Sequence, residues 1–279
     1  MDIKKIKDQV LKDIFEEIPD LIKGASDFSL KSLKSKKNIV CELTFNKKPL
    51  KFPKVVVLKL FQTAYFEKEY NALIKLKEQN LPIPEILFYK KPYLILKKIN
   101  GANLCDFIND KLIDVPSLES LDENSKELLF RSVKKLAEWF AHLHNKNISN
   151  NKDITDIIVL NKGDAHLRDF LYDTKKNIVY GMDFEESFDG NYLDDLAWIC
   201  CSFLDTNPGI FEVPEGTVKM EFINYFLKEY FTFNDKFKFS FTYFADRLIE
   251  NLNAVIKRRP IELRSLRKNV ILENILKKL

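Results

Sequence analysis

Lys162-Gly163-Asp164-Ala165-His166-Leu167-Arg168-Asp169 is a polar loop, and Gly181-Met182-Asp183-Phe184-Glu185 follows it after two short β-rich runs joined by a Thr-Lys-Lys-Asn turn. This pattern predicts a hairpin, which would bring Asp164, Asp169 and Asp183 toward one another. Grouped carboxylates can hold Mg²⁺ against a triphosphate, and one of them can orient or deprotonate an attacking hydroxyl. The alternative interpretation is three ordinary aspartates of surface turns.

A single charge interrupts an apolar run upstream of this loop. Lys59 lies in Val-Val-Val-Leu-Lys-Leu, so its ammonium requires a partner. Glu69 on the next predicted helix is suitable, and Glu67 competes with it. Such a lysine can supply the cation that a triphosphate needs. The alternative is an edge-strand lysine whose ammonium extends into solvent.

The first third of the chain predicts a small α+β lobe. An amphipathic helix over residues 2–23 is followed by the order strand, strand, strand, helix, strand, strand over residues 26–98. The strands are expected at Phe28–Leu33, Ile39–Phe45, Lys54–Leu60, Glu85–Tyr89 and Tyr93–Lys98, and the helix at 62–79.

The remainder of the chain is mainly helical. Asn100-Gly101 reads as a linker, so we expect a nucleotide-binding lobe with its preceding helix over 1–98 and a catalytic lobe over 99–279. The predicted elements of the second lobe are a helix over 122–147, a mixed region over 154–183, and helices near 191–205, 217–232, 238–257 and 261–277.

Composition excludes several classes of protein. Hydrophobic residues make up 46% and charged residues 31% of 279, which is typical of a globular protein, and the net charge of +4 is too small to indicate a nucleic-acid partner. With 7 Gly, a glycine-rich phosphate loop is not expected. Four cysteines without CxxC spacing indicate reduced core residues rather than a zinc site. A charged N-terminus and the lack of a long apolar run predict a cytoplasmic protein without a membrane span.

The order of these motifs resembles the protein-kinase-like superfamily, in its aminoglycoside phosphotransferase and choline kinase branch. That branch has a loop H-G-D-x-H-x-x-N, then a strand, an I-D-F/W segment and a D-L-A helix. The matching residues are Lys162 to Asp169, Asp183-Phe184, and Asp195-Leu196-Ala197. Leu81–Leu87 resembles I-P-V-P-x-V-L, and Tyr93–Gly101 resembles the hinge strand L-L-M-E-x-I-x-G. The resemblance covers residues 26–205 and implies an α+β, two-lobed fold with a small antiparallel-sheet N-lobe and a mainly helical C-lobe.

The resemblance also implies a function and a role for each residue. The activity would be transfer of a phosphoryl group to a hydroxyl, with ATP and Mg²⁺ as cofactors. Asp164 would be the catalytic base, and Asp183 and Asp169 would bind Mg²⁺. Lys59 would hold the phosphates, with Glu69 orienting it. In the same branch the equivalent of Asp195 braces the catalytic loop, and the equivalent of His166 supports it.

Several positions depart from the family pattern. Lys162 replaces the first His, so one packing contact is lost or replaced, and Asp169 replaces Asn, which keeps an oxygen ligand and adds a negative charge. Where a glycine-rich loop is usual, the chain offers cations that can act as point charges: Lys31, Lys34, Lys36 and Lys37. The stretch 145–163 is also longer than usual.

Three functional hypotheses follow. The first is a kinase for a small-molecule hydroxyl, where a cationic substrate would meet acidic residues just past Asp183: Glu185, Glu186, Asp189 and Asp194. The second is an RNA or protein kinase that uses the basic stretch Lys257–Lys268 to contact phosphates; a solvated helix face is the plainer interpretation of that stretch. The third is a pseudokinase that binds a partner without catalysis, against which the retention of Asp164, Asp183 and Lys59 argues.

Overall fold

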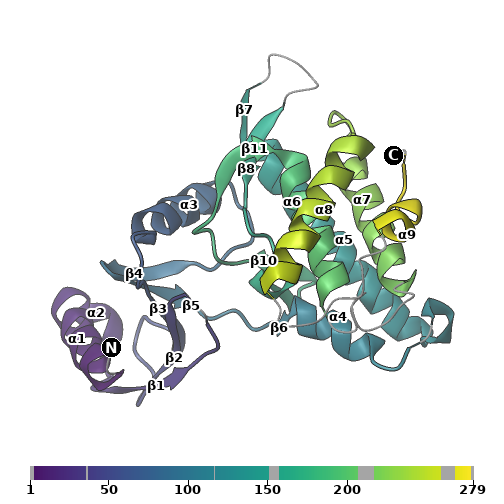
Figure 1. Ribbon diagram of the computed structural model, residues 1–279. Helices are drawn as coiled ribbons and strands as arrows, with labels where there is room; N and C mark the ends of the chain where they lie inside the picture. Colours follow the sequence, from purple (N-terminus) through teal and green to yellow (C-terminus); the bar gives the residue numbers. More distant parts are fainter. Residues whose placement is uncertain are drawn as a thin grey trace. The chain divides into compact units, whose positions relative to one another are not determined.

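The computed structural model describes residues 3–35, 37–115, 117–150, 157–206, 217–258 and 268–277. The chain divides into two compact units. The first consists of Met1–Lys77 and Pro84–Ile99, and the second of Glu78–Ile83 and Asn100–Leu279. Figure 1 shows the helices and strands of both.

The first unit is built on a five-stranded antiparallel sheet of order β1-β2-β3-β5-β4. Its strands are β1 (Phe28–Ser32), β2 (Ile39–Phe45), β3 (Val55–Leu60), β4 (Ile86–Lys90) and β5 (Tyr93–Lys97). The helix α3 (Phe66–Glu78) connects β3 to β4. The predicted order of strands and helix is therefore confirmed, although α3 begins later than residue 62.

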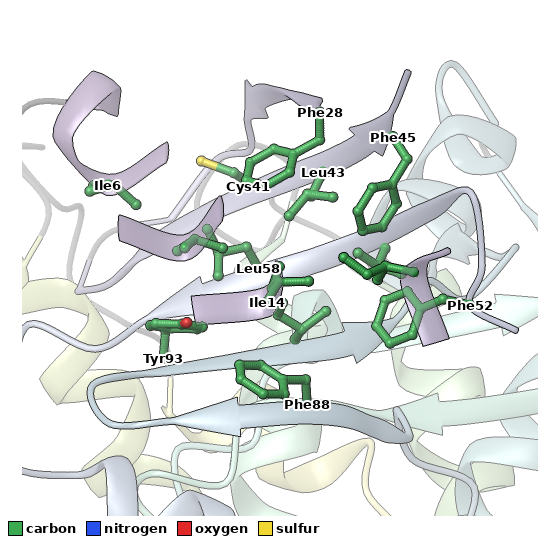
Figure 2. Packing of buried hydrophobic residues seen from close by; sticks show 14 of the residues in the cluster. Ile6, Ile14, Phe28, Cys41, Leu43, Phe45, Phe52, Leu58, Phe88 and Tyr93 are labelled. Carbon is green, nitrogen blue, oxygen red and sulfur yellow. The ribbon is translucent and has the colours of Figure 1, made fainter. Parts of the chain in front are cut away.

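The two faces of this sheet have different environments. On one face, residues of alternating positions in β2 and β3 form a buried apolar cluster with the helix α1 (Ile3–Glu17), as Figure 2 shows for Leu43, Leu58 and Ile14. Because side chains alternate along a strand, Lys59 points to the opposite face from Leu58. One face of the sheet thus packs against α1, and the other face carries the candidate functional residue Lys59.

The helix predicted over 2–23 is divided in two. The helix α1 ends at Glu17, and a short helix α2 (Pro19–Ile22) follows. Pro19 occupies the beginning of α2, and Ile18 before it has a non-helical backbone with φ of −131°. Proline has no backbone N–H and disfavours a helical residue before it, which explains the break.

The second unit contains the remaining helices: α4 (Leu104–Leu112), a 3-10 turn η1 (Leu118–Ser120), α5 (Glu123–Lys146), α6 (Tyr192–Asp205), α7 (Thr217–Phe233), α8 (Phe241–Arg258) and α9 (Lys268–Glu273). The helix α5 packs on α7, and α6 packs on α8. The Asp122 side chain caps α5 by accepting a hydrogen bond from the Ser125 backbone. The prediction of a helix from residue 261 falls partly outside the described residues, and α9 covers its centre. Among the described helices, none is both long and apolar enough to cross a membrane.

Two small sheets lie among these helices. One has the order β10-β9-β6, from β6 (Ala102–Asn103), β9 (Phe170–Asp173) and β10 (Ile178–Gly181). The other has the order β11-β8-β7, from β7 (Ile148–Asn150), β8 (Ile158–Asn161) and β11 (Phe188–Asn191). The antiparallel pair β9–β10 confirms the predicted hairpin. The pair β7–β8 was not predicted and accounts for the long stretch between α5 and the polar loop.

Residues Glu78–Ile83, in the connection from α3 to β4, belong to the second unit and are held there by hydrogen bonds. The backbone carbonyl of Pro82 accepts hydrogen bonds from Trp139 Nε1 at 2.9 Å and from the Gly181 amide at 3.1 Å. The side chains of Gln79 and Asn147 form two hydrogen bonds with each other, at 3.0 and 2.8 Å. A Cβ on Gly181 would lie 2.2 Å from the Trp139 ring, so the contact requires glycine.

Candidate active site

The polar loop that follows β8 is held by a buried carboxylate. Asp195, on α6, is fully buried. It accepts hydrogen bonds from the backbone amides of Lys162 at 2.6 Å and Gly163 at 3.0 Å. Its Oδ2 also lies 3.3 Å from His144 Nε2, and His144 Nδ1 lies 2.8 Å from the Tyr230 hydroxyl. The expected bracing by Asp195 is confirmed, and it extends through α5 to α7.

The backbone of the loop is bent into an uncommon conformation. Gly163, Asp164 and Asp183 all have positive φ, of 68°, 41° and 62°. Aspartate is one of the few residues besides glycine that is enriched in this region, yet it still adopts it at a cost. At Gly163 a Cβ would lie 2.1 Å from the Glu186 carbonyl oxygen, so only glycine fits. The two aspartates are thus fixed on strained turns, and both side chains are exposed.

The hairpin β9–β10 places Asp169 and Asp183 at the same end. Phe170 and Gly181 are partners in the register, and the Met182 amide donates to the Asp169 carbonyl at 2.8 Å. Asp169 is the last residue of a 3-10 turn η2 (Leu167–Asp169) that the His166 side chain caps by accepting from the Arg168 amide at 3.2 Å. The supporting role expected of His166 fits this contact.

Lys162 is the main surprise of the site. Its side chain is buried, and its ammonium donates to the Asp169 carboxylate at 3.2 Å and to the backbone carbonyl of Asp183 at 3.0 Å. Position 162 therefore carries a buried side chain, packed beside Phe170 and Phe184. Sequence reasoning treated Lys162 and Asp169 as two separate departures. The opposite charges of Lys162 and Asp169 on the same loop were the signal in the sequence that could have indicated this ion pair.

Charge within the loop acts on Asp169 from several sides. Burial raises the pKa of Asp169, the Lys162 ammonium opposes this rise, and the nearby Asp183 carboxylate adds to it. The net direction is upward from the ordinary value. Lys162 thus partly offsets the cost of keeping a second negative charge beside Asp183.

The residues present fit a divalent cation. Carboxylate oxygens of Asp183 and Glu185 lie within 4.8 Å of each other, and Asp169 is at the same end of the hairpin. Oxygen donors of this kind are the ligands that Mg²⁺ prefers. Glu185 is buried, and sequence reasoning assigned it to substrate instead. Asp164 is exposed on the loop, and no contact of its carboxylate with Asp169 or Asp183 is found among the described residues.

In the first unit, Lys59 and Glu69 form a buried ion pair, with side-chain exposures of 8% and 2%. Of the two partners considered from the sequence, Glu69 is therefore the one found. Glu67 is exposed and lies 3.4 Å from Lys91 instead. The Lys59 ammonium also lies 4.9 Å from the centre of the Phe61 ring.

Other predicted contributors fall outside a recognisable site. Lys31, Lys34 and Lys37 are exposed at or after the end of β1, and Lys36 lies outside the described residues. Residues 259–267 of the basic stretch Lys257–Lys268 also lie outside them; Lys257 and Arg258 are exposed at the end of α8, and Lys268 begins α9.

The expected acidic substrate pocket needs a correction. Asp194 Oδ1 accepts from the Tyr243 hydroxyl at 2.9 Å and from Arg247 Nε at 2.8 Å. Its side chain is 8% exposed, so it joins α6 to α8 and is neutralised by Arg247. The prediction that Asp194 lines a pocket for a cationic substrate is wrong. Adjacent acidic residues on one helix turn point in different directions, and here Asp195 faces the loop while Asp194 faces α8.

Comparisons with known proteins concern the fold. No family model matches the sequence, and no curated protein matches it. A Ralstonia eutropha JMP134 protein assigned to the aminoglycoside phosphotransferases is similar over 98% of this chain and 94% of its own, with a TM-score of 0.59 and 12% identity. Plasmodium vivax ethanolamine kinase is similar over 98% and 87%, with a TM-score of 0.56 and 13% identity. The chain therefore has the α+β protein-kinase-like fold that the sequence resembles.

Proposed function

We propose that this protein is a kinase that transfers the γ-phosphoryl group of ATP, with Mg²⁺, to a hydroxyl group of a small molecule. The observation that carries the proposal is the joining of Asp169 and Asp183 by Lys162 beside the braced loop of Asp164. Within a protein-kinase-like fold, a group of carboxylates on fixed turns supports phosphoryl transfer better than a set of unrelated surface turns.

Each residue has a proposed role. Asp164 accepts the proton of the acceptor hydroxyl, whose oxygen then bonds to the γ-phosphorus while the bond to the β–γ bridging oxygen breaks and ADP leaves. Asp169 and Asp183 hold the cation, which when bound neutralises charge on the phosphates. Lys59 contacts the phosphates, and Glu69 fixes its position. Most of the effect of Asp164 comes from positioning the hydroxyl, because the phosphoryl group needs little covalent assistance.

A small molecule is the favoured acceptor. Ethanolamine kinase from Plasmodium vivax, with the same fold, is named for a small amino-alcohol. Asp189 is exposed on β11 and stays a candidate for contact with a cationic substrate. The four cysteines are free and buried, which fits a reducing cytoplasmic setting.

The test is a screen for ATP consumption across hydroxyl-bearing small molecules and RNA, with and without Mg²⁺. We expect Mg²⁺-dependent turnover with a small molecule, and a loss of about 10²-fold or more in kcat for Asp164→Asn, the range for removal of a general base. Nucleotide binding by calorimetry should survive this change. Asp246→Asn, an exposed aspartate of α8, is the matched control and should keep wild-type turnover.

Other outcomes redirect the proposal. Turnover with RNA alone would favour the second hypothesis. ATP binding without consumption for any acceptor would favour a pseudokinase. Wild-type turnover in Asp164→Asn would reject this residue as the base.

A further inference from the structure

We infer that Lys162 and Asp169 act as one unit, in which Lys162 is a positioning residue that holds the Asp169 carboxylate and the Asp183 backbone together. The inference deepens the proposed function and rests on it for the role of Asp169 as a metal ligand. The physical coupling of the two residues is measurable whether or not the protein transfers phosphate.

The surroundings of the Lys162 ammonium leave it little choice of partner. The side chain is 1% exposed. Its ammonium lies 5.7 Å from the centre of the Phe170 ring and 5.9 Å from that of Phe184. The oxygens that it meets are Asp169 Oδ2 and the Asp183 carbonyl, 21 residues downstream of Lys162. A buried ammonium requires such partners, so it ties the two ends of the hairpin to each other.

The two carboxylate oxygens of Asp169 differ in their hydrogen bonds. Oδ2 accepts from Lys162 Nζ at 3.2 Å and from the His166 amide at 3.3 Å. Within the part of the chain that the structure describes, Oδ1 accepts no hydrogen bond. One oxygen is therefore committed to the protein, and the other is left for a cation.

This arrangement makes asparagine at position 169 a poor replacement, although the family pattern has Asn there. An amide has one acceptor, and both Lys162 and the His166 amide are donors. The amide oxygen would have to turn toward them, which leaves its NH₂ group where the cation needs an oxygen. A buried lysine without its counter-charge would also remain. The charges of Lys162 and Asp169 cancel each other, so a substitution that keeps this region stable must change both residues together.

The experiment is a double-mutant cycle on the full chain without metal or nucleotide. The variants are Lys162→Met, Asp169→Asn and their combination, and the readout is the thermal unfolding midpoint. Removing one partner of a buried ion pair is strongly destabilising, so we expect Asp169→Asn to lower Tm by roughly 5 °C or more. The double variant should recover at least half of that loss, since methionine fills the space between the two phenylalanines without a charge.

A second readout concerns the cation. Calorimetry with Mn²⁺ and a non-hydrolysable ATP analogue should show at least tenfold weaker binding in Asp169→Asn. The variant Lys162→His/Asp169→Asn, which carries the family pair, should recover part of this loss, because a neutral imidazole can accept from the amide NH₂ and so allows the amide oxygen to face the cation.

The control is Lys176→Met combined with Asp169→Asn. Lys176 lies in the turn between β9 and β10, and its exposed ammonium is 3.7 Å from the Asp173 carboxylate. We expect its effect on Tm to add to that of Asp169→Asn. Additive effects in the Lys162 cycle as well would overturn the inference. If Asp169→Asn fails to fold, recovery of soluble protein in the double variant supports the coupling, and a double variant that is equally insoluble rejects it.

Discussion

The carboxylate of Glu69 on α3 pairs with the ammonium of Lys59 on β3, and both groups are buried. Burial makes the pair interdependent, because either charge alone would be left in a poorly solvated position. The exposed pair of Lys91 and Glu67, in the same unit, has no such constraint. A comparison of the two pairs separates the effect of burial from that of ion pairing.

Lys59→Ala should destabilise the protein and weaken ATP binding. Loss of one partner from a buried pair costs on the order of 3 kcal/mol. Lys91→Ala should change the free energy of unfolding by less than about 1 kcal/mol, since exposed ion pairs contribute little. Urea denaturation measures the stability of both variants, and calorimetry measures their nucleotide affinity. Unchanged nucleotide affinity in a folded Lys59→Ala protein would contradict the assigned role of this lysine.

Gly163→Ala should disturb the polar loop far more than Gly24→Ala. Both glycines have positive φ, of 68° and 98°, so alanine is strained at each by about 1 kcal/mol or more. At Gly163 the new Cβ would meet the Glu186 carbonyl at 2.1 Å, whereas at Gly24 its nearest neighbour is the Lys48 carbonyl at 3.8 Å. The Gly163→Ala variant should have both a lower thermal unfolding midpoint and a lower turnover than the wild type. Equal losses of stability at the two sites would show that the backbone conformation alone decides the effect.

Asp13 predicts a pH dependence of the first unit. Burial raises the pKa of Asp13, but hydrogen bonds from Lys90 at 2.8 Å, Gln9 at 2.9 Å and Tyr93 at 2.9 Å outweigh it, and the net pKa is lowered. A lowered folded pKa stabilises the protein above the unfolded pKa of about 3.9. The contribution is lost as the pH falls through the folded pKa.

Urea denaturation between pH 7 and pH 3 tests this dependence. Asp13→Asn should reduce the free energy of unfolding at pH 7 by roughly 1–3 kcal/mol, and the difference from wild type should shrink below about pH 4. Asp8→Asn, an exposed carboxylate of the same helix, should show neither effect. A difference that stays constant down to pH 3 would mean that ionisation of Asp13 is not what stabilises α1.

Much of the fold was predictable because local patterns decide it. Apolar and polar residues alternate over Cys41–Phe45, Val55–Leu60 is an almost continuous apolar run typical of a buried strand, and the turn after Asp173 fixes the hairpin. The strands β7 and β11 were missed: β7 contains 3 residues, and β11 reads Phe-Asp-Gly-Asn and pairs with β8, much earlier in the chain. Such segments carry too few apolar side chains to show a period.

The candidate site divides in the same way. The hairpin that places Asp169 and Asp183 at the same end was predictable, because the turn that forms it is local; the roles of Asp164, Asp169 and Asp183 stay predictions. The contacts that hold the polar loop were not predictable, since they come from residues far along the chain such as Asp195 and Tyr230. The packing of α6 determines which way each of its side chains faces, and a shift of one position along the helix separates a side chain that faces the polar loop from one that faces α8. This is why Asp194 was assigned wrongly.

Asp194 and Asp195 are neighbours on α6 with different partners, and this contrast gives a sharp prediction. Asp194→Asn should lower stability, because its contact with Arg247 is weakened, and should leave turnover close to wild type. Asp195→Asn should reduce kcat substantially while the protein still binds nucleotide. An amide has a single acceptor oxygen, so the amides of Lys162 and Gly163 can no longer each have a carboxylate oxygen of their own.

The cost at Asp195 falls on the loop that carries Asp164, where a displacement of about 1 Å can reduce a rate by roughly 10²-fold. Tyr230→Phe probes the outer end of the same chain of contacts and should give a smaller loss, since it removes one hydrogen bond to His144. Steady-state kinetics alongside thermal unfolding separates these effects. The two variants are compared at similar values of Tm. If Asp194→Asn and Asp195→Asn then lost turnover equally, general destabilisation of α6 would explain both losses, and the bracing of the loop by Asp195 would have no catalytic importance.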